Sequence, residues 1–120
     1  MDSALEPRVR ATTVQLLRWL VAGDYAAIEH FTAGVRMPSA EIQESVNKYG
    51  RTLIMPPERS LDDLDVIDIA PEVCRGRRQW SVRVALWTVE EGRSDLSMEC
   101  TMIDRSGDLL GVEMDNIIVF

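Results

Sequence analysis

The stretch WSVRVALWTVEEGRSDLSMECTMI, residues 80–103, decides how this chain folds. Successive side chains of a β-strand point to opposite faces, so apolar residues at every second position predict a strand with one buried face. Both halves of the stretch alternate in this way, with apolar residues at even numbers: Trp80, Val82, Val84 and Leu86, then Leu96, Met98, Cys100 and Met102. The stretch therefore predicts a long antiparallel hairpin that turns within residues 90–94.

The alternation also restricts how the strands pair. Residues directly opposite one another in an antiparallel pair share a face, so their numbers must sum to an even value here. A three-residue loop at 91–93 satisfies this rule and pairs Leu86 with Met98. A second three-residue loop at 105–107 leads into a last strand and pairs Cys100 with Val112. The two turns predict one continuous apolar face across three strands.

Two further segments extend this hairpin into a sheet. Three β-branched residues, Val66, Ile67 and Ile69, predict a strand ahead of it. Residues 51–63 show no periodicity, and we expect them to cross from the helices to the sheet in an extended conformation. Residues 109–120 alternate like a strand, but the apolar positions change phase near Asp115-Asn116. A phase change inside a strand predicts a β-bulge.

The first part of the chain has the periodicity of helices. Apolar residues at three- and four-residue spacings predict a helix over residues 5–22, which ends at Gly23. Asp24 is expected to cap a second, short helix, DYAAIEHF. Ser39 is expected to cap a third helix that ends at Gly50. The predicted fold is α+β: one domain over residues 1–120, with three N-terminal helices packed on one face of a four-stranded antiparallel β-meander.

Composition restricts the class of protein. The 120 residues are 46% hydrophobic and 28% charged, which is typical of a globular domain. No apolar run approaches the roughly 20 residues that span a bilayer, and the start of the chain lacks a secretory signal, so we expect a cytoplasmic protein that does not bind membranes. The formal net charge is -7, and the acidic excess lies in residues 61–120. This charge disfavours nucleic-acid binding and suits a basic protein partner.

The second face of the predicted sheet is where we expect a binding site. The predicted register places Glu99 directly opposite Glu113 and Arg83 diagonal to Glu99. Like charges in this position destabilise a sheet unless a cation or a partner neutralises them. The predicted partner-binding residues are therefore Arg83, Trp87, Glu99, Glu113 and Asp115, with Trp87 as an aromatic anchor. A solvated sheet face, in which Arg83 bridges the glutamates, is the plainer interpretation.

No catalytic, metal-binding or cofactor motif is visible. His30 is the only histidine and has no nucleophile at a motif spacing, so we assign no catalytic residue, no metal and no cofactor. Cys100 falls in an apolar strand position, whereas Cys74 lies in a polar connection where exposure is expected. The following Arg-rich loop, residues 75–78, is able to contact a phosphate or an acidic group. It is too short to form a nucleic-acid patch.

Three segments carry a resemblance to known families. The segments LWTVEEGRSDL (86–96), MDNIIVF (114–120) and LVAGDYAAIE (20–29) resemble a family of small bacterial proteins of unknown function. This resemblance covers nearly the whole chain and implies a bacterial domain without transferable catalytic residues. The order of helices and sheet is also similar to the cone-like nuclear-transport-factor superfamily, which places a ligand pocket between helices and sheet. One strand-and-helix unit and the usual Asp–His pair of that superfamily are missing here.

These observations lead to two function classes. The first is a non-enzymatic binding protein that uses the acidic outer sheet face, either to self-associate as a dimer or to neutralise a basic partner, as immunity proteins do. The second is a small-molecule binder or enzyme with a pocket between the helices and the sheet. A pocket lined only by Leu, Val, Met and Cys side chains would be packed shut, so inward polar groups would favour the second class.

Overall fold

The alternating stretch forms the two longest strands of the protein, β3 (Gln79–Thr88) and β4 (Gly92–Ile103). We describe a computed structural model, which places residues 5–74, 76–105 and 107–119. All eight apolar side chains of the hairpin that were predicted to be buried are at most 3% exposed. The alternation therefore predicted the buried face of the hairpin correctly.

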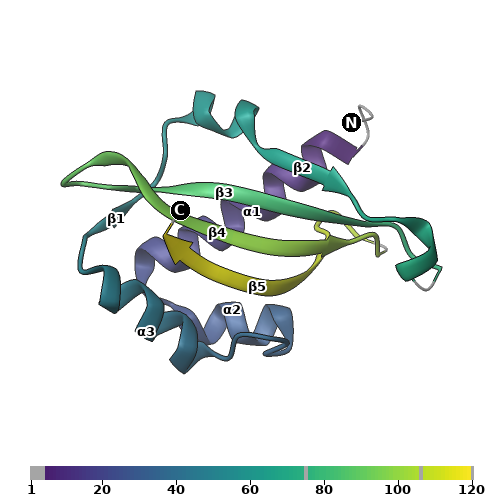
Figure 1. Cartoon of the computed structure of the whole chain (residues 1–120), viewed down its shortest axis with the longest axis horizontal. Coiled ribbons are helices and arrows are strands. Elements are labelled where there is room, and N and C mark those ends of the chain that lie inside the picture. The colour runs from purple at the N-terminus through teal and green to yellow at the C-terminus, as the bar shows by residue number, and fades with distance from the viewer. Residues whose placement is uncertain (1–4, 75, 106, 120) are drawn as a thin grey trace.

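Three more strands complete one antiparallel sheet (Figure 1). On one side of the hairpin, β5 (Gly111–Val119) pairs with β4. On the other side, β1 (Leu53–Ile54) and β2 (Asp65–Asp68) pair with opposite ends of β3. The sheet has five strands rather than four because the segment expected to be extended contains β1 and the 3-10 helix η1 (Glu58–Asp63). A second 3-10 helix, η2 (Pro71–Val73), precedes β3.

Near both turns, the numbers of directly paired residues sum to an even value, as predicted. Each turn nevertheless lies at a different position in the sequence from the predicted one. In the hairpin, Thr88 pairs with Gly92, so the loop is 89–91 instead of 91–93. Beyond an irregularity between Ala85 and Trp87, the register places Val84 opposite Met98. The second connection spans residues 104–110, because Ile103 pairs with Gly111. Both predicted registers were therefore displaced by two or more residues, which keeps every side chain on its predicted face.

The predicted bulge in the last strand is confirmed. Glu99 pairs with Asn116 and the next residue, Cys100, pairs with Met114, so Asp115 is the extra residue on β5. An extra residue restores the inward position of the following apolar side chain, and Ile117 is only 6% exposed. The bulge thus turns Asp115 away from the core.

The helices are α1 (Leu5–Ala22), α2 (Tyr25–Thr32) and α3 (Ser39–Tyr49). Asp24 caps α2 as predicted, since its carboxylate accepts the Ala27 N–H at 3.2 Å. The third helix ends at Gly50 as predicted, but its predicted N-cap was wrong: Pro38 is the N-cap, and the N–H of Ser39 donates to the Glu29 carboxylate at 2.8 Å. Proline fixes the φ angle that the start of a helix needs, so Ser39 is already inside the helix.

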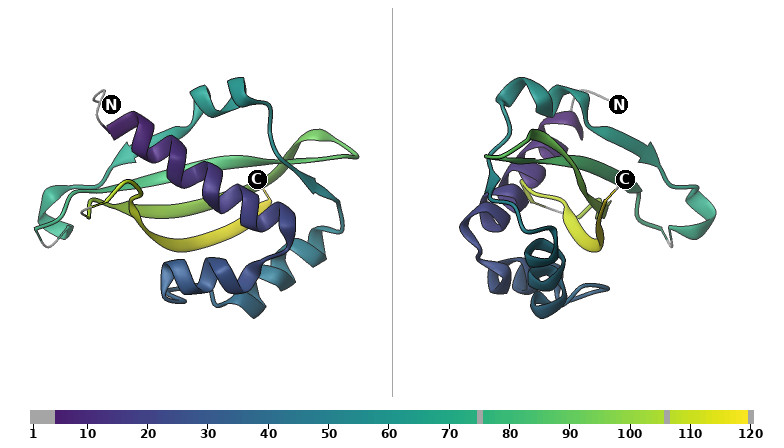
Figure 2. Two further views of the ribbon diagram at one scale, coloured as in Figure 1. Left: turned by 180° about the vertical axis from the view of Figure 1, so that it is seen from behind. Right: turned by 60° about the vertical axis from the view of Figure 1, so that its left-hand side comes forward.

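All three helices lie on one side of the sheet. Figure 2 (left) shows α1 running diagonally across the sheet, while α2 and α3 lie beside β5. The core between these layers includes Leu16, Leu20 and Ile28 from the helices and Met98 and Met102 from β4. The opposite face of β3, β4 and β5, here called the outer face, carries no helix (Figure 1). No helix among the described residues is long and apolar enough to span a membrane.

Candidate functional site

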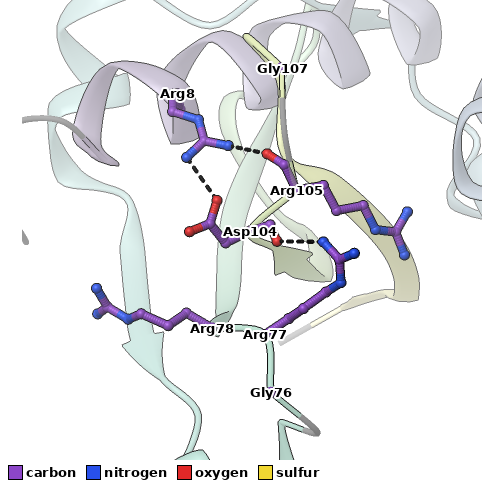
Figure 3. Close-up of a pocket in the computed structure, with 7 residues that line it drawn as sticks. All are labelled: Arg8, Gly76, Arg77, Arg78, Asp104, Arg105 and Gly107. Atoms are coloured by element: carbon purple, nitrogen blue, oxygen red, sulfur yellow. Dashed lines mark hydrogen bonds and ion pairs between the residues drawn. The ribbon is translucent and has the colours of Figure 1, made fainter.

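Four arginines line a pocket at the end of the sheet where α1 begins, and with Asp104 they define the surface that we call the arginine pocket (Figure 3). The pocket has a volume of about 900 Å³ and opens to solvent. Three segments far apart in sequence build it: the first turns of α1, the segment before β3, and the β4–β5 connection. Its lining residues are Arg8, Gly76, Arg77, Arg78, Asp104, Arg105 and Gly107.

Arg8 ties α1 to the β4–β5 connection. Its Nη1 donates to Asp104 Oδ1 at 3.0 Å, and its Nη2 donates to the Arg105 carbonyl at 2.7 Å. Its Nε is buried and has no hydrogen-bond partner within the described part of the chain. Arg8 therefore orders the connection, and one of its donors remains unused.

Arg77 and Arg105 have no acidic partner among the residues that the structure describes. Arg77 Nη1 donates to the Asp104 carbonyl at 3.2 Å, and Figure 3 shows its side chain pointing toward the connection. The Arg105 side chain lies over Gly111, where an added Cβ would come within 2.8 Å of it. The absence of a side chain at Gly111 thus leaves the space that Arg105 occupies.

The Arg78 side chain points away from Arg77 (Figure 3) and is held by Asp68 and Trp80. It forms an ion pair with Asp68 at 3.3 Å, and its guanidinium lies 5.0 Å from the centre of the Trp80 ring. Both contacts hold the cation without removing it from solvent. The pocket lining contains four arginines and one carboxylate, so its charge is positive. Guanidinium groups donate hydrogen bonds in a planar geometry that suits phosphate and carboxylate oxygens.

The predicted outer-face residues lie on one face of the sheet, but their expected juxtaposition was wrong. Glu99 lies opposite Asn116, and Glu113 lies opposite Thr101, because the connection after β4 is longer than predicted and Asp115 bulges. Arg83 lies directly opposite Glu99 rather than diagonal to it, with its Nη2 at 3.2 Å from the carboxylate. The opposed glutamates that suggested an external cation are therefore absent from this sheet.

A cation from the chain itself neutralises the other two carboxylates. Arg36, in the link between α2 and α3, places Nη2 at 3.2 Å from Glu113 and Nε at 3.1 Å from Asp115 Oδ1. The Thr101 hydroxyl donates to the other oxygen of Asp115 at 2.7 Å. Burial nevertheless raises the pKa of Asp115 above its ordinary value. The sequence offered no sign of this contact, since Arg36 and Glu113 are 77 positions apart.

Trp87 lies at the other end of the outer face, directly opposite Arg93. The ring is partly buried and passes over Gly92, where a Cβ would lie 3.8 Å away. Trp87, Arg83, Arg93 and the buried Ser97 line a hollow of about 230 Å³. The structure therefore brings Trp87 together with Arg83, and it places Glu113 and Asp115 in a separate group with Arg36.

The remaining sequence candidates are not arranged for chemistry. Cys74, expected to be exposed, is only 4% exposed, and its thiol donates to the Ile69 and Ala70 carbonyls. Burial raises the pKa of Cys100 to about 12, so that its reactive thiolate form is suppressed. His30 is exposed on α2. Within the described ranges, no group of three or more His, Cys, Asp or Glu side chains is arranged to hold a metal ion.

The space beneath the helices is occupied by side chains. Three methionines of the inner sheet face, Met98, Met102 and Met114, have no exposed surface. Five pockets among the described residues lie at the ends, edges and outer surfaces of the molecule. The geometry thus favours a surface site over an internal one.

Comparison with known proteins identifies a family. Residues 17–120 match the family described as "Domain of unknown function (DUF7668)". No curated protein and no solved structure matches the chain. The match covers both β segments of the resemblance noted in the sequence and most of the helical part, but it leaves out the start of α1, where Arg8 lies.

Proposed function

Because the chain belongs to the DUF7668 family of domains of unknown function, we propose a function from its geometry: a non-enzymatic binding protein whose arginine pocket holds a phosphate group. The observation that carries this proposal is the pair Arg77 and Arg105, two converging cations without an acidic partner among the described residues. Arginines placed together repel one another, and a bound anion relieves that repulsion.

The number of unpaired cations favours phosphate over a carboxylate. A phosphate monoester carries close to two negative charges at neutral pH and has three acceptor oxygens. Arg77 and Arg105 match these two charges. Asp104 supplies the only carboxylate among the residues that line the pocket. It therefore opposes an incoming anion while it orients Arg8.

Calorimetric titration with methyl phosphate tests the proposal. We expect Arg105→Ala to weaken binding by about tenfold or more, because a charged hydrogen bond contributes about 1.5–3 kcal/mol. Asp104→Asn should instead strengthen binding by about threefold, since it removes a repelling negative charge from the pocket lining. Arg59→Ala, which removes an exposed arginine of η1 that does not line the pocket, is the matched control.

Weaker methyl phosphate binding by Arg105→Ala and tighter binding by Asp104→Asn, with unchanged affinity in Arg59→Ala, would support a phosphate site in the pocket. Equal losses for Arg105→Ala and Arg59→Ala would show a general charge effect and contradict the proposal. Absence of binding by the wild-type protein at low ionic strength would contradict it as well.

The outer face supports a second candidate function, docking of a protein partner or of a second copy. The observation that favours it is the hollow beside Trp87, which lies between η1 and a sheet face that no α-helix covers (Figure 1). We expect the double variant Trp87→Ala, Glu113→Ala to abolish association and to keep the thermal unfolding profile of a folded protein. Light scattering after gel filtration at several concentrations measures the association. If the double variant associates like the wild type, or if neither associates, the outer face is a solvated surface only.

We place this binding function in the bacterial cytoplasm. The two cysteines are both free and buried, which suits a reducing compartment. A net charge of -7 suits a basic protein partner for the outer face, while the arginine pocket selects the anion.

A further inference from the structure

A second pocket adjoins the arginine pocket and has a different chemical character. Its volume is about 510 Å³, and it lies between the end of β2, η2 and the start of β3. Both pockets are lined by the segment Gly76–Arg78, so this segment forms their common wall. The remaining lining of the second pocket is Ile69, Pro71, Cys74, Gln79 and Asp68, whose carboxylate forms the ion pair with Arg78.

The polar groups of this second pocket are already paired within the protein. The Cys74 thiol donates to the carbonyls of Ile69 and Ala70 at 3.5 and 3.3 Å. The Gln79 side-chain amide donates to the Cys74 carbonyl at 3.2 Å. The side chains of Ile69 and Pro71 add hydrocarbon surface. A wall whose donors are used internally suits an apolar group better than a polar one.

Gly76 leaves the common wall open at one position. It adopts φ +85°, and a Cβ built there would meet no atom within 4 Å. The space beside Gly76, which both pockets adjoin, therefore holds no side chain at this position. A single ligand is able to place its phosphate among the arginines and extend past Gly76 into the second pocket.

We propose that the ligand is an alkyl phosphate monoester, or another phosphate with an apolar substituent of several carbons, that occupies both pockets. This inference rests on the proposed phosphate site and names the class of ligand that this site takes. The phosphate pairs with Arg77 and Arg105, and the hydrocarbon packs against Ile69 and Pro71.

Hexyl phosphate and methyl phosphate, compared by calorimetry below the concentration of micelle formation, test the inference. Wild-type protein should bind hexyl phosphate at least about tenfold more tightly, since each buried methylene strengthens binding by about fourfold. Ile69→Gln should remove most of this advantage and leave methyl phosphate binding unchanged. Ile67→Gln, two residues away on β2 and 60% exposed outside both pocket linings, is the matched control. Pro71→Ser is a second variant in case Ile69→Gln does not fold.

The outcomes separate this inference from the proposed function. Equal affinities for the two phosphates, with both lost in Arg105→Ala, would overturn the apolar extension and leave the phosphate site standing. If Ile69→Gln and Pro71→Ser still bind hexyl phosphate more tightly than methyl phosphate, the hydrocarbon lies elsewhere, and this result would also overturn the apolar extension. Failure of both phosphates to bind would overturn the phosphate site and this inference together.

Discussion

Arg36 holds an unusual backbone conformation in the link between α2 and α3. Its φ is +70°, and the Met37 N–H donates to the Val35 carbonyl at 2.9 Å across it, which makes a γ-turn with a left-handed central residue. Such a conformation costs on the order of 1–3 kcal/mol for a residue with a side chain. The contacts of Arg36 with Glu113 and Asp115 offset this strain, because both carboxylates are more than half buried.

The buried carboxyl of Asp115 predicts how stability depends on pH. Its pKa is raised in the folded protein, so in mildly acidic solution the folded state holds a proton more tightly than the unfolded state. The free energy of unfolding should therefore gain a contribution from Asp115 at low pH that is lost as the pH rises through the raised pKa.

Urea unfolding of the wild type and of Asp115→Asn between pH 3 and pH 7 measures this effect. The difference in stability, wild type minus variant, should fall as the pH rises and then become constant. A difference that grows with pH would mean that Arg36 and Thr101 outweigh burial and lower the pKa instead.

At the scale of elements, the tip of the β3–β4 hairpin is tied to the end of α3 and to β1. Both carboxylate oxygens of Glu91 lie within 2.9 Å of the Tyr49 hydroxyl, which is able to donate to either. Glu90 accepts the Thr52 N–H at 2.9 Å and the Thr52 hydroxyl at 3.0 Å. These contacts fix where the hairpin turns, because both glutamates must reach residues outside the hairpin.

Tyr49 reports on this connection directly. Its hydrogen bond to the Glu91 carboxylate raises the Tyr49 pKa, because loss of the phenol proton would leave two anions in contact. We expect Glu91→Gln to lower the Tyr49 pKa toward the ordinary tyrosine value. Ring resonances from NMR follow the titration, and Tyr25 on α2 is the internal reference. An unchanged Tyr49 pKa in Glu91→Gln would show that the hydroxyl does not contact Glu91 in solution.

Periodicity predicted the elements of the fold but not their exact pairing. The spacing of apolar residues was sufficient for α1, for the buried face of the hairpin and for the bulge at Asp115, because each depends on neighbours in the sequence. The turn at 89–91 depends on Tyr49 and Thr52, which no local pattern connects to it. A displacement by an even number of residues keeps the same face buried, so the alternation alone cannot detect it.

The candidate sites also depend on contacts between residues far apart in the sequence, which local patterns do not predict. The outer-face residues were assigned to the correct face, but their neutralising partner, Arg36, comes from a helix link. The Arg-rich loop at 75–78 was recognised as a possible phosphate contact, and Arg75 lies outside the described residues. Arg8 joins the pocket from 96 positions away, so that only the folded chain shows that four arginines line this pocket.

At the scale of the whole molecule, charge is separated rather than evenly spread. The chain has a net charge of -7, yet four arginines gather at the end of the sheet beside the start of α1 (Figure 3). On the outer face, Arg36 and Arg83 instead pair with Glu113, Asp115 and Glu99. An anion therefore meets available donors at the arginine pocket, whereas Arg36 and Arg83 are already paired with carboxylates.

Arginine Nε–H resonances, recorded by NMR during titration with methyl phosphate, test that claim most directly. We predict saturable shifts for Arg77 and Arg105, with a smaller shift for Arg8, and no shifts for Arg36 and Arg83. Shifts of the same size at Arg36 and Arg83, or none at Arg77 and Arg105, would contradict a phosphate site in the arginine pocket.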